Sequence, residues 1–390
     1  MNINIIQEAR NNHENVVNWR RTLHQIPELG LQLPQTVAFV AGKLEEMGIS
    51  YEIYEDCSCI TATIGKGGKC ILLRGDMDGL PVVEESGLDF ASTNGCSHAC
   101  GHDFHAASLL GAAKILKDHE SELPGTVKLI FQSAEETFKG AAAAIAHGVM
   151  ENPRVDAAFA THVFAGMPLN AVFYGKYPMA SVYGFKIRIQ GKGTHGSSPE
   201  TGVDPLVVGA NILLSLQEII AREIPAAEEA VLTIGHFEGG SVANVVPDSA
   251  ILEGTLRTFK QEIKDYIVPR ITEIAESIAK AYRASITVEE LSNVPAVAED
   301  DGMIELMLNA VKKLDNGMTT MPALHAMGSE DFAFYSVQVP SVIIGMGAGV
   351  EDKSKWVGQH NPRILFHEDI LLNEVAMYVE MALDYLEANK

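Results

Sequence analysis

The order of the expected strands and helices constrains the fold of this 390-residue chain more than any other feature. Up to about residue 179, short β-rich runs alternate with segments of helical periodicity, which is typical of an α/β layer with a largely parallel sheet. The β-rich runs lie at 60–65, 69–75, 126–131 and 155–163. A strand at 339–347 and an amphipathic helix near 368–388 continue this pattern. The length favours two domains over one.

A different order interrupts the α/β pattern near residue 180. Strands are expected at 181–193, 229–239, 249–259 and 284–291, with helices at 204–221 and 261–283. The order β-α-β-β-α-β is that of a ferredoxin-like α+β sandwich. We therefore predict a catalytic α/β domain in two parts, residues 1–179 and 293–390, with an inserted domain at residues 180–292.

Charge and composition exclude several classes of partner. The formal net charge is −22, so a polyanion such as nucleic acid is not an expected ligand. The sequence lacks the roughly 18 uninterrupted apolar residues of a membrane span, and its start does not resemble a signal peptide. Five cysteines without such a signal favour reduced thiols and a cytoplasmic protein with no membrane partner.

The stretch SHACGHDFHAA, residues 97–107, carries most of the chemical information. Cys100 and His102 are separated by one residue, so both side chains can face one side of a loop. Three further polar clusters, each beginning where a predicted strand ends, contribute Asp76, Asp78, Glu135, Glu136 and His162. The carboxyl ends of strands in an open α/β sheet form one rim, so these side chains are expected to meet.

Each cluster alone has an ordinary explanation, such as a turn cap, a solvated loop or a buried thiol. Their convergence favours a metal site, because several carboxylates in one cleft would repel one another without a cation. Thiolate, imidazole and carboxylate together suit zinc, cobalt, nickel, manganese or iron better than calcium or magnesium.

A series of motifs runs through nearly the whole chain: RRTLHQIPELG, RGDMDGLP, HACGHDFH, SAEET, THV, GKGTHGSSPETGVDP, NVVPDSAILEGTLRTF, MGSEDFAFY and GQHNP. In this order they resemble the dinuclear metallo-aminoacylase and carboxypeptidase superfamily, and most closely its amidohydrolase branch. That branch includes hippurate hydrolases, N-acyl-L-amino acid amidohydrolases, auxin-conjugate hydrolases and N-acetyldiaminopimelate deacetylases. The resemblance implies a zinc-exopeptidase-like fold, a mixed and mostly parallel sheet flanked by helices, whose inserted ferredoxin-like domain serves as lid and dimerisation domain.

The resemblance also implies two divalent metal ions per subunit, chosen among Zn, Mn, Co and Ni. By motif position, the ligands would be Cys100, His102, Glu136, His162 and His360. Glu135 would act as the general base on a metal-bridging water, and Asp78 would orient a ligating imidazole. Asp76 is not expected to bind a metal in this branch.

Three residues of the inserted domain complete the implied site. His195, in the GKGTHGSSP loop, would stabilise the oxyanion, from its own or a partner subunit. Asn244 and Arg257 would bind substrate, and a guanidinium suits the carboxylate of an N-acyl amino acid. An edge strand of this domain is a template for a homodimer or larger assembly.

These inferences predict a cytoplasmic, metal-dependent amidohydrolase. It would hydrolyse the amide of small N-acetyl- or N-benzoyl-like L-amino acids to a carboxylate and a free amino acid. The alternatives within the enzymes are a dipeptidase or metallocarboxypeptidase and an N-acetyldiaminopimelate deacetylase. Outside them are a thiol-based redox or metal-storage protein using Cys96 and Cys100, and a non-catalytic binding protein.

Overall fold

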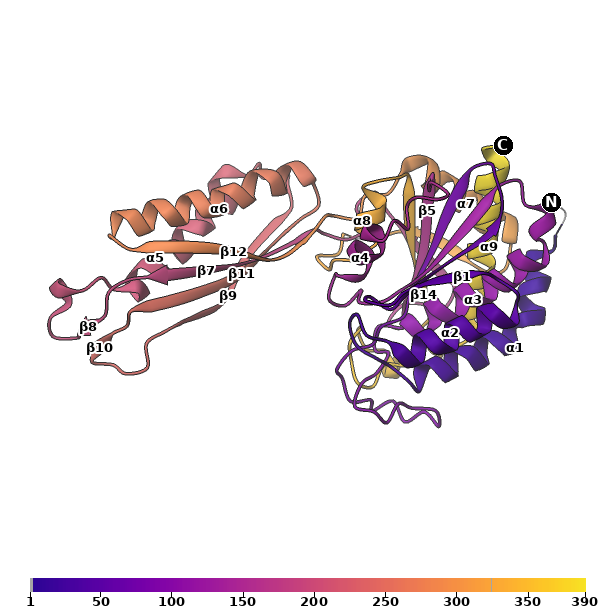
Figure 1. Cartoon of the computed structure of the whole chain (residues 1–390), viewed down its shortest axis with the longest axis horizontal. Coiled ribbons are helices and arrows are strands. Elements are labelled where there is room, and N and C mark those ends of the chain that lie inside the picture. Colours follow the sequence, from indigo (N-terminus) through magenta and orange to yellow (C-terminus); the bar gives the residue numbers. More distant parts are fainter. Residues whose placement is uncertain (1–2, 324) are drawn as a thin grey trace. The chain divides into compact units, whose positions relative to one another are not determined.

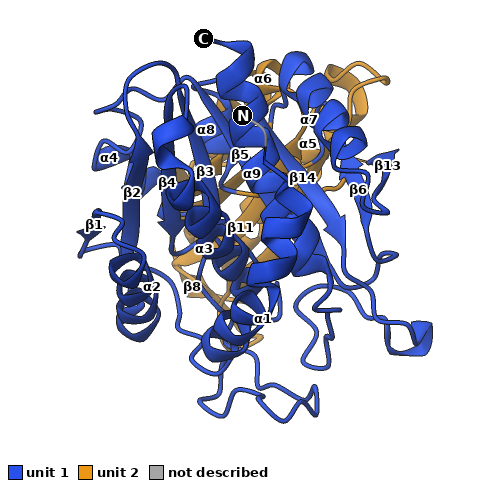
Figure 2. Ribbon diagram, turned by 90° about the vertical axis from the view of Figure 1, so that its right-hand side faces the viewer, with its two compact units in different colours: residues 1–178, 298–324, 331–390 blue, residues 179–297, 325–330 orange. Residues whose placement is uncertain are grey.

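A computed structural model of the chain describes residues 3–323 and 325–390. They form two compact units, coloured separately in Figure 2. Unit 1 comprises residues 1–178, 298–324 and 331–390, and unit 2 comprises residues 179–297 and 325–330.

Unit 1 is built on an eight-stranded sheet with the order β1-β2-β4-β3-β5-β14-β6-β13. The pairs β4/β3, β3/β5, β5/β14 and β6/β13 are parallel, and the other three are antiparallel. The strands are β1 (Tyr51–Tyr54), β2 (Cys59–Gly65), β3 (Cys70–Asp76), β4 (Thr126–Gln132), β5 (Ala157–Phe164), β6 (Ala171–Tyr174), β13 (Thr319–Pro322) and β14 (Ser341–Gly347). The predicted mixed, mostly parallel sheet is confirmed.

Helices flank this sheet (Figure 1). They are α1 (Ile5–His24), α2 (Pro34–Glu46), α3 (His102–Asp118), α4 (Gly140–Ala146), α7 (Asp301–Leu314), α8 (Ala333–Ser336) and α9 (Ile370–Ala388). Helices α1, α3 and α9 pack against one another, and α3 and α9 also contact β3 and β5. Every residue of β3 and β4 is buried, as expected for central strands that are covered on both faces.

Unit 2 is a four-stranded antiparallel sheet, in the order β12-β7-β11-β9, with two helices. Its elements are β7 (Val182–Gln190), α5 (Pro205–Glu218), β9 (Ala230–Gly239), β11 (Ser249–Thr258), α6 (Gln261–Ala281) and β12 (Ser285–Val294). A short ladder joins β8 (Thr194–His195) to β10 (Val245–Val246). This β-α-β-β-α-β order is the ferredoxin-like one.

Helix α5 begins as its sequence predicts. The Asp204 carboxylate accepts hydrogen bonds from the backbone N–H groups of Leu206 and Val207, and Pro205 occupies the first turn. With the helical turn that follows it, the segment Pro205–Glu223 is long and apolar enough to cross a membrane by length and composition. Val208, Ile212 and Leu216 are buried in the core of unit 2, so one face of the segment packs against the sheet of this unit.

Two separate segments of the chain make up unit 2. Residues 325–330 belong to unit 2, although the sequence analysis placed this stretch in the second part of the α/β domain. Arg257 Nη1 donates to the Met327 carbonyl at 2.7 Å and to Ser329 Oγ at 3.1 Å. These contacts attach the short segment to β11, and no local sequence pattern predicts such a long-range pairing.

Candidate metal centre

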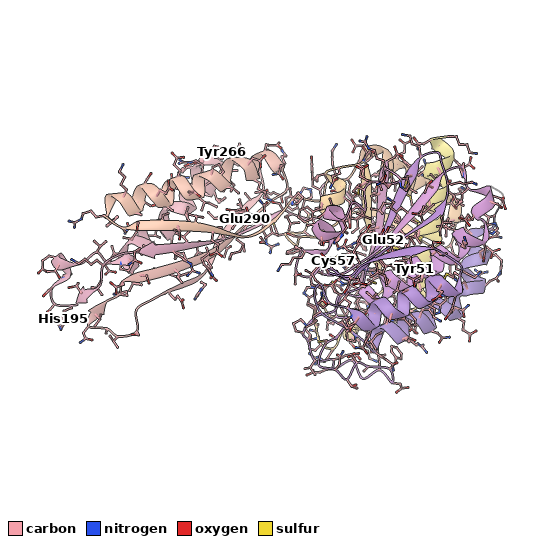
Figure 3. All side chains as sticks on the ribbon, in the orientation of Figure 1. Tyr51, Glu52, Cys57, His195, Tyr266 and Glu290 are labelled. Carbon is pink, nitrogen blue, oxygen red and sulfur yellow. The ribbon has the colours of Figure 1, made fainter. Side chains whose placement is uncertain are left out.

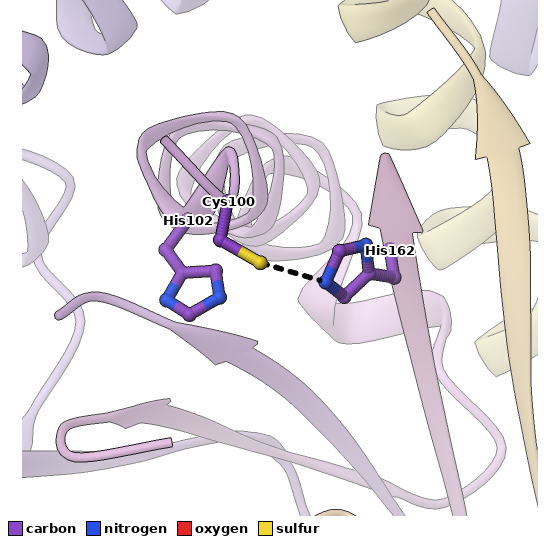
Figure 4. A group of neighbouring side chains, drawn as sticks. All are labelled: Cys100, His102 and His162. Atoms are coloured by element: carbon purple, nitrogen blue, oxygen red, sulfur yellow. Dashed lines mark hydrogen bonds between the residues drawn. The ribbon is translucent and has the colours of Figure 1, made fainter. Parts of the chain in front are cut away.

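Segments far apart in the sequence bring the predicted ligands of unit 1 to one site. Glu136 follows β4, His162 lies within β5, and Cys100 and His102 stand at the start of α3. Three groups of donors each have their atoms within 4.8 Å of one another. The groups are Cys100 with His102 and His162, Cys100 with Glu136 and His360, and His102 with Glu135 and Glu136. Figure 4 shows Cys100, His102 and His162, with Cys100 Sγ 3.5 Å from His162 Nε2. The structure therefore brings together all five predicted ligands, and their binding of metal stays a prediction.

Hydrogen bonds fix the orientation of two imidazoles. His162 Nδ1 lies 3.0 Å from the Val163 carbonyl and His102 Nδ1 lies 2.9 Å from the Asp78 carbonyl. Because a carbonyl oxygen can only accept, both rings carry their hydrogen on Nδ1. In its neutral form each ring therefore has its lone pair on Nε2, as in metal sites where the second ring nitrogen binds a backbone or carboxylate oxygen.

Two buried atoms of the cluster fit the demand for a cation. His102 Nε2 and Glu136 Oε1 are buried and have no hydrogen-bond partner among the residues that the structure describes. His360 Nε2 lies 3.4 Å from the same Glu136 oxygen. Buried polar atoms without partners cost free energy, and a metal ion would satisfy both.

The pKa directions agree with this interpretation. Burial raises the pKa of Glu136 and raises that of the Cys100 thiol, so without a cation both groups are held toward their neutral forms. Burial opposes charge on His102, but nearby Asp76 and Cys100 outweigh it and raise the pKa of His102 well above its usual value. A divalent cation at the cluster would reverse this balance, since it favours a thiolate, a carboxylate and a neutral imidazole.

Asp78 holds the base and a ligand in one arrangement. Its two carboxylate oxygens accept hydrogen bonds from the backbone N–H groups of Glu135, at 3.1 Å, and Glu136, at 3.2 Å. Oδ1 of Asp78 is also 3.3 Å from His102 Nδ1. One buried carboxylate thus positions a ring and the turn that carries the two glutamates.

Asp76 and His105 also come close to His102 and form a further group of possible donors with it, but both have other polar contacts. Asp76 pairs with Arg74 Nη1 at 2.6 Å and with His105 Nδ1 at 2.5 Å. His105 Nε2 accepts from the Val163 N–H at 2.9 Å. Burial would raise the pKa of Asp76, yet Arg74 and the two histidines lower it well below its usual range. This arrangement is consistent with the expectation that Asp76 is not a ligand.

Glycine at position 101 makes the close approach of the ligand loop possible. Gly101 has φ +94°, in the left-handed region, and a Cβ there would lie 2.4 Å from Val163 Cγ2. This residue separates Cys100 from His102 and precedes helix α3. Both the backbone angle and the contact with β5 therefore require glycine.

The substrate-binding residues predicted from the sequence lie in unit 2. His195 on β8 pairs with Val245 on β10, and the adjacent Gly196 N–H donates to the Asn244 carbonyl at 2.8 Å. His195 is exposed at its end of unit 2 (Figure 3), and its Nδ1 is 2.8 Å from Ser197 Oγ. Arg257 is half-buried, and burial lowers its pKa. His195 thus lies on this ladder and Asn244 directly precedes it, while Arg257 stands on β11.

Comparison with known proteins assigns the family. Residues 72–384 match the model of peptidase family M20/M25/M40. The chain belongs to this family. It is similar to an N-acetylcysteine deacetylase of Bacillus subtilis (strain 168), with 36% identity over 386 residues that cover 97% of this chain and 98% of the relative. It is also similar to the IAA-amino acid hydrolase ILR1-like 4 of Arabidopsis thaliana, at 35% identity covering 95% and 86%.

A solved structure extends this M20 relationship to the fold. The YXEP protein of Bacillus subtilis, described as a dinuclear metal binding peptidase from the M20 family, superposes with a TM-score of 0.82. It is 33% identical, and the match covers 97% of this chain and 99% of that one. The predicted resemblance to this superfamily is therefore confirmed.

The sequence analysis of this M20 member missed two supporting elements. Gln359 Nε2 donates to the carbonyls of Cys100, at 2.9 Å, and Val163, at 3.0 Å, and so ties the ligand loop to β5. Arg74 pairs with Asp331 at 2.8 Å, behind Asp76. An arginine within the apolar run of β3 was an available signal, whereas Gln359 stood out only as the neighbour of His360.

Proposed function

We propose that this M20 member hydrolyses the amide bond of N-acyl L-amino acids, and that it does so as a metal-dependent amidohydrolase. The observation that carries the proposal is the single cluster of Cys100, His102, Glu136, His162 and His360 with Glu135 beside it. The names of its relatives, a deacetylase of N-acetylcysteine and a hydrolase of IAA-amino acids, support an N-acyl amino acid as substrate.

The cluster would hold two divalent ions, in keeping with the dinuclear relative. When bound, these ions polarise the amide carbonyl and lower the pKa of water, which makes hydrolysis feasible near neutral pH. Cys100 belongs to two of the donor groups, one with His162 and one with Glu136 and His360, which supports a role for its thiolate in holding the ions.

Glu135 is the proposed general base. Its Oε2 lies 3.9 Å from His102 Nε2, and the side chain is almost fully buried. It would take a proton from the attacking water and deliver it to the leaving amine. Asp78 would act as a positioning residue, because it binds the backbone N–H of Glu135 and faces His102.

The residues of unit 2 would bind two parts of the substrate, the amide oxygen that becomes an oxyanion and the charged α-carboxylate. His195 would donate a hydrogen bond to the oxyanion, and Asn244 would assist in binding. Arg257 would bind the α-carboxylate, a group that every N-acyl amino acid has and that suits a guanidinium.

The assembly and the compartment are part of the same proposal. We infer a homodimer formed through unit 2, with His195 serving the neighbouring subunit, and a cytoplasmic location supported by five free cysteines. Mixing inactive Glu135→Gln and His195→Ala subunits tests the dimer. If His195 acts across subunits, hybrids regain one complete site and the mixture recovers about a quarter of wild-type activity. No recovery in a mixture with demonstrated subunit exchange would place His195 in its own subunit.

A substrate panel tests the reaction itself. Metal-free protein is reloaded with Zn, Mn, Co or Ni and assayed on N-acetyl and N-benzoyl amino acids and on dipeptides. The proposal expects turnover of the N-acyl amino acids in a metal-dependent manner. Efficient cleavage of dipeptides alone would instead assign a peptidase, since a peptidase must accept a free amino group on the acyl side.

A further inference from the structure

A second group of metal-binding side chains lies in unit 1 outside the centre described above. Asp56 and Cys57 stand in the turn between β1 and β2, and His147 follows the end of α4. One donor atom from each lies within 4.8 Å of the other two, and Asp56 Oδ1 is 2.7 Å from His147 Nε2. None of these residues has a part in the proposed hydrolysis.

The turn supplies a second thiol next to the first. Cys59 follows Cys57 by two residues, and the Cys59 thiol donates a hydrogen bond to the Cys57 sulfur. This hydrogen bond is the main reason that the pKa of Cys57 falls to about 7. Ser58, between them, has φ +51°, an angle uncommon for a residue other than glycine. The turn that carries Cys57 therefore has a constrained backbone.

Packing restrains the group on both sides. The His147 ring stacks on Tyr54, with ring centroids 4.6 Å apart and planes within 13° of parallel. Ser133 Oγ donates a hydrogen bond to the Cys57 carbonyl and also lies 3.6 Å from Cys59 Sγ. The imidazole and the two thiols are thus held in place before any ion binds.

The group is also open to solvent on one side. Cys57 is buried, while the Asp56 side chain is 73% exposed. A cavity of about 340 Å³, lined by Tyr54, Lys128 and His147 among others, reaches the imidazole. Cys57 is labelled on unit 1 in Figure 3, near Tyr51 and Glu52, which also border on this region.

We propose that Asp56, Cys57 and His147 form a second metal site for a borderline-soft divalent ion such as Zn²⁺. Thiolate, imidazole and carboxylate are ligands that Zn²⁺ accepts in tetrahedral sites. The ion takes the place of the hydrogen that joins His147 Nε2 to Asp56, and binding releases the thiol proton of Cys57.

Metal content tests the proposal in the complete protein. Wild type, Cys57→Ser and His147→Gln are loaded with Zn²⁺, separated from free metal and analysed for zinc per subunit. Each variant is expected to hold one ion fewer than wild type and to retain hydrolysis within about twofold. Cys70→Ser is the matched control, because Cys70 is another buried thiol of unit 1 and should keep the wild-type content. Equal zinc content in all four proteins would overturn the proposal.

The absorption spectrum of bound Co²⁺ provides a second measurement, which tests whether the Cys57 sulfur is a ligand. Cys100 would also give a thiolate-to-cobalt charge-transfer band, so the titration uses Co²⁺ with Cys100→Ser protein. The band is expected to persist in Cys100→Ser and to disappear in the double variant Cys100→Ser/Cys57→Ser. A band absent from the first protein or unchanged in the second would contradict the site, even if the zinc content of one variant had fallen through misfolding.

Discussion

The metal centre of unit 1 and the substrate residues of unit 2 differ in how firmly they are held. In the centre, the rings of His102 and His162 are buried and oriented by carbonyl groups, and Asp78 supports the adjacent glutamates. In unit 2, His195 is exposed on a two-residue ladder. On the proposed roles, the centre in unit 1 is preorganised for its ions, whereas His195 in unit 2 would act only when substrate arrives.

The largest expected effect is that of Glu135→Gln, which separates chemistry from metal binding. The amide cannot accept a proton, so kcat should fall by about 10²–10⁴-fold. Metal content per subunit, measured in parallel, should stay at the wild-type value. Glu136→Gln is the matched comparison and should lose metal as well as activity. A Glu135→Gln enzyme that turns over at the wild-type rate would end the general-base assignment.

His195→Ala should produce the next largest effect and tests the other side of the comparison. Loss of an oxyanion donor costs about 10²–10³-fold in kcat. Because His195 is assigned to substrate and not to the ions, metal content should remain unchanged. His236→Ala, an exposed histidine on β9, is the control and should behave as wild type. Metal loss in His195→Ala would remove the distinction between the two regions.

Asp78→Asn breaks the preorganisation of unit 1 directly. Asp78 accepts one hydrogen bond on each carboxylate oxygen, from the backbone N–H groups of Glu135 and Glu136. An asparagine has only one acceptor oxygen, so its NH₂ group would face one of these N–H donors. Metal affinity should fall by about 10–100-fold, as measured by competition with a chelator. Asp118→Asn, an exposed change at the end of α3, should leave affinity unaltered. Unaltered affinity in Asp78→Asn would show that the ligands need no such support.

Arg257→Lys should have a smaller effect, confined to substrate binding. A lysine cannot form two parallel hydrogen bonds to a carboxylate, so KM should rise by roughly tenfold with little change in kcat. Arg188→Lys, at an exposed position of β7, is the control. The same rise in KM for a substrate whose carboxylate is amidated would exclude carboxylate recognition by Arg257.

Glu299 gives the smallest effect, on stability and not on activity. Burial raises the pKa of Glu299 to about 8 from 4.5. Between these pH values the Glu299 carboxyl group is ionised in the unfolded chain and protonated in the folded chain. The free energy of unfolding should therefore decrease as pH rises through this window. Urea unfolding at several pH values should show this slope in wild type and a flatter one in Glu299→Gln. An identical slope would exclude the titration of Glu299 as its cause.

Local spacing in the sequence predicted much of the centre. Cys100 with His102, and Glu135 with Glu136, are neighbours in the chain, and the alternation of strands and helices predicted a common rim. The support behind them depends on distant pairing and was not predictable from spacing. Arg74 meets Asp331 across 257 positions, and Gln359 reaches both Cys100 and Val163 from a loop. His360 itself adopts φ +66°, which no sequence pattern near it indicates.

The return of residues 325–330 to unit 2 has a consequence for anyone who redesigns this protein. Deletion of residues 179–297 alone would remove Arg257 and leave Ser329 without this hydrogen-bond partner. Ser329 lies only two residues before Asp331, which pairs with Arg74 in unit 1. A related domain inserted in place of residues 179–297 alone would also lack the matching segment 325–330. An exchange of unit 2 between relatives should therefore transfer residues 179–297 and 325–330 together.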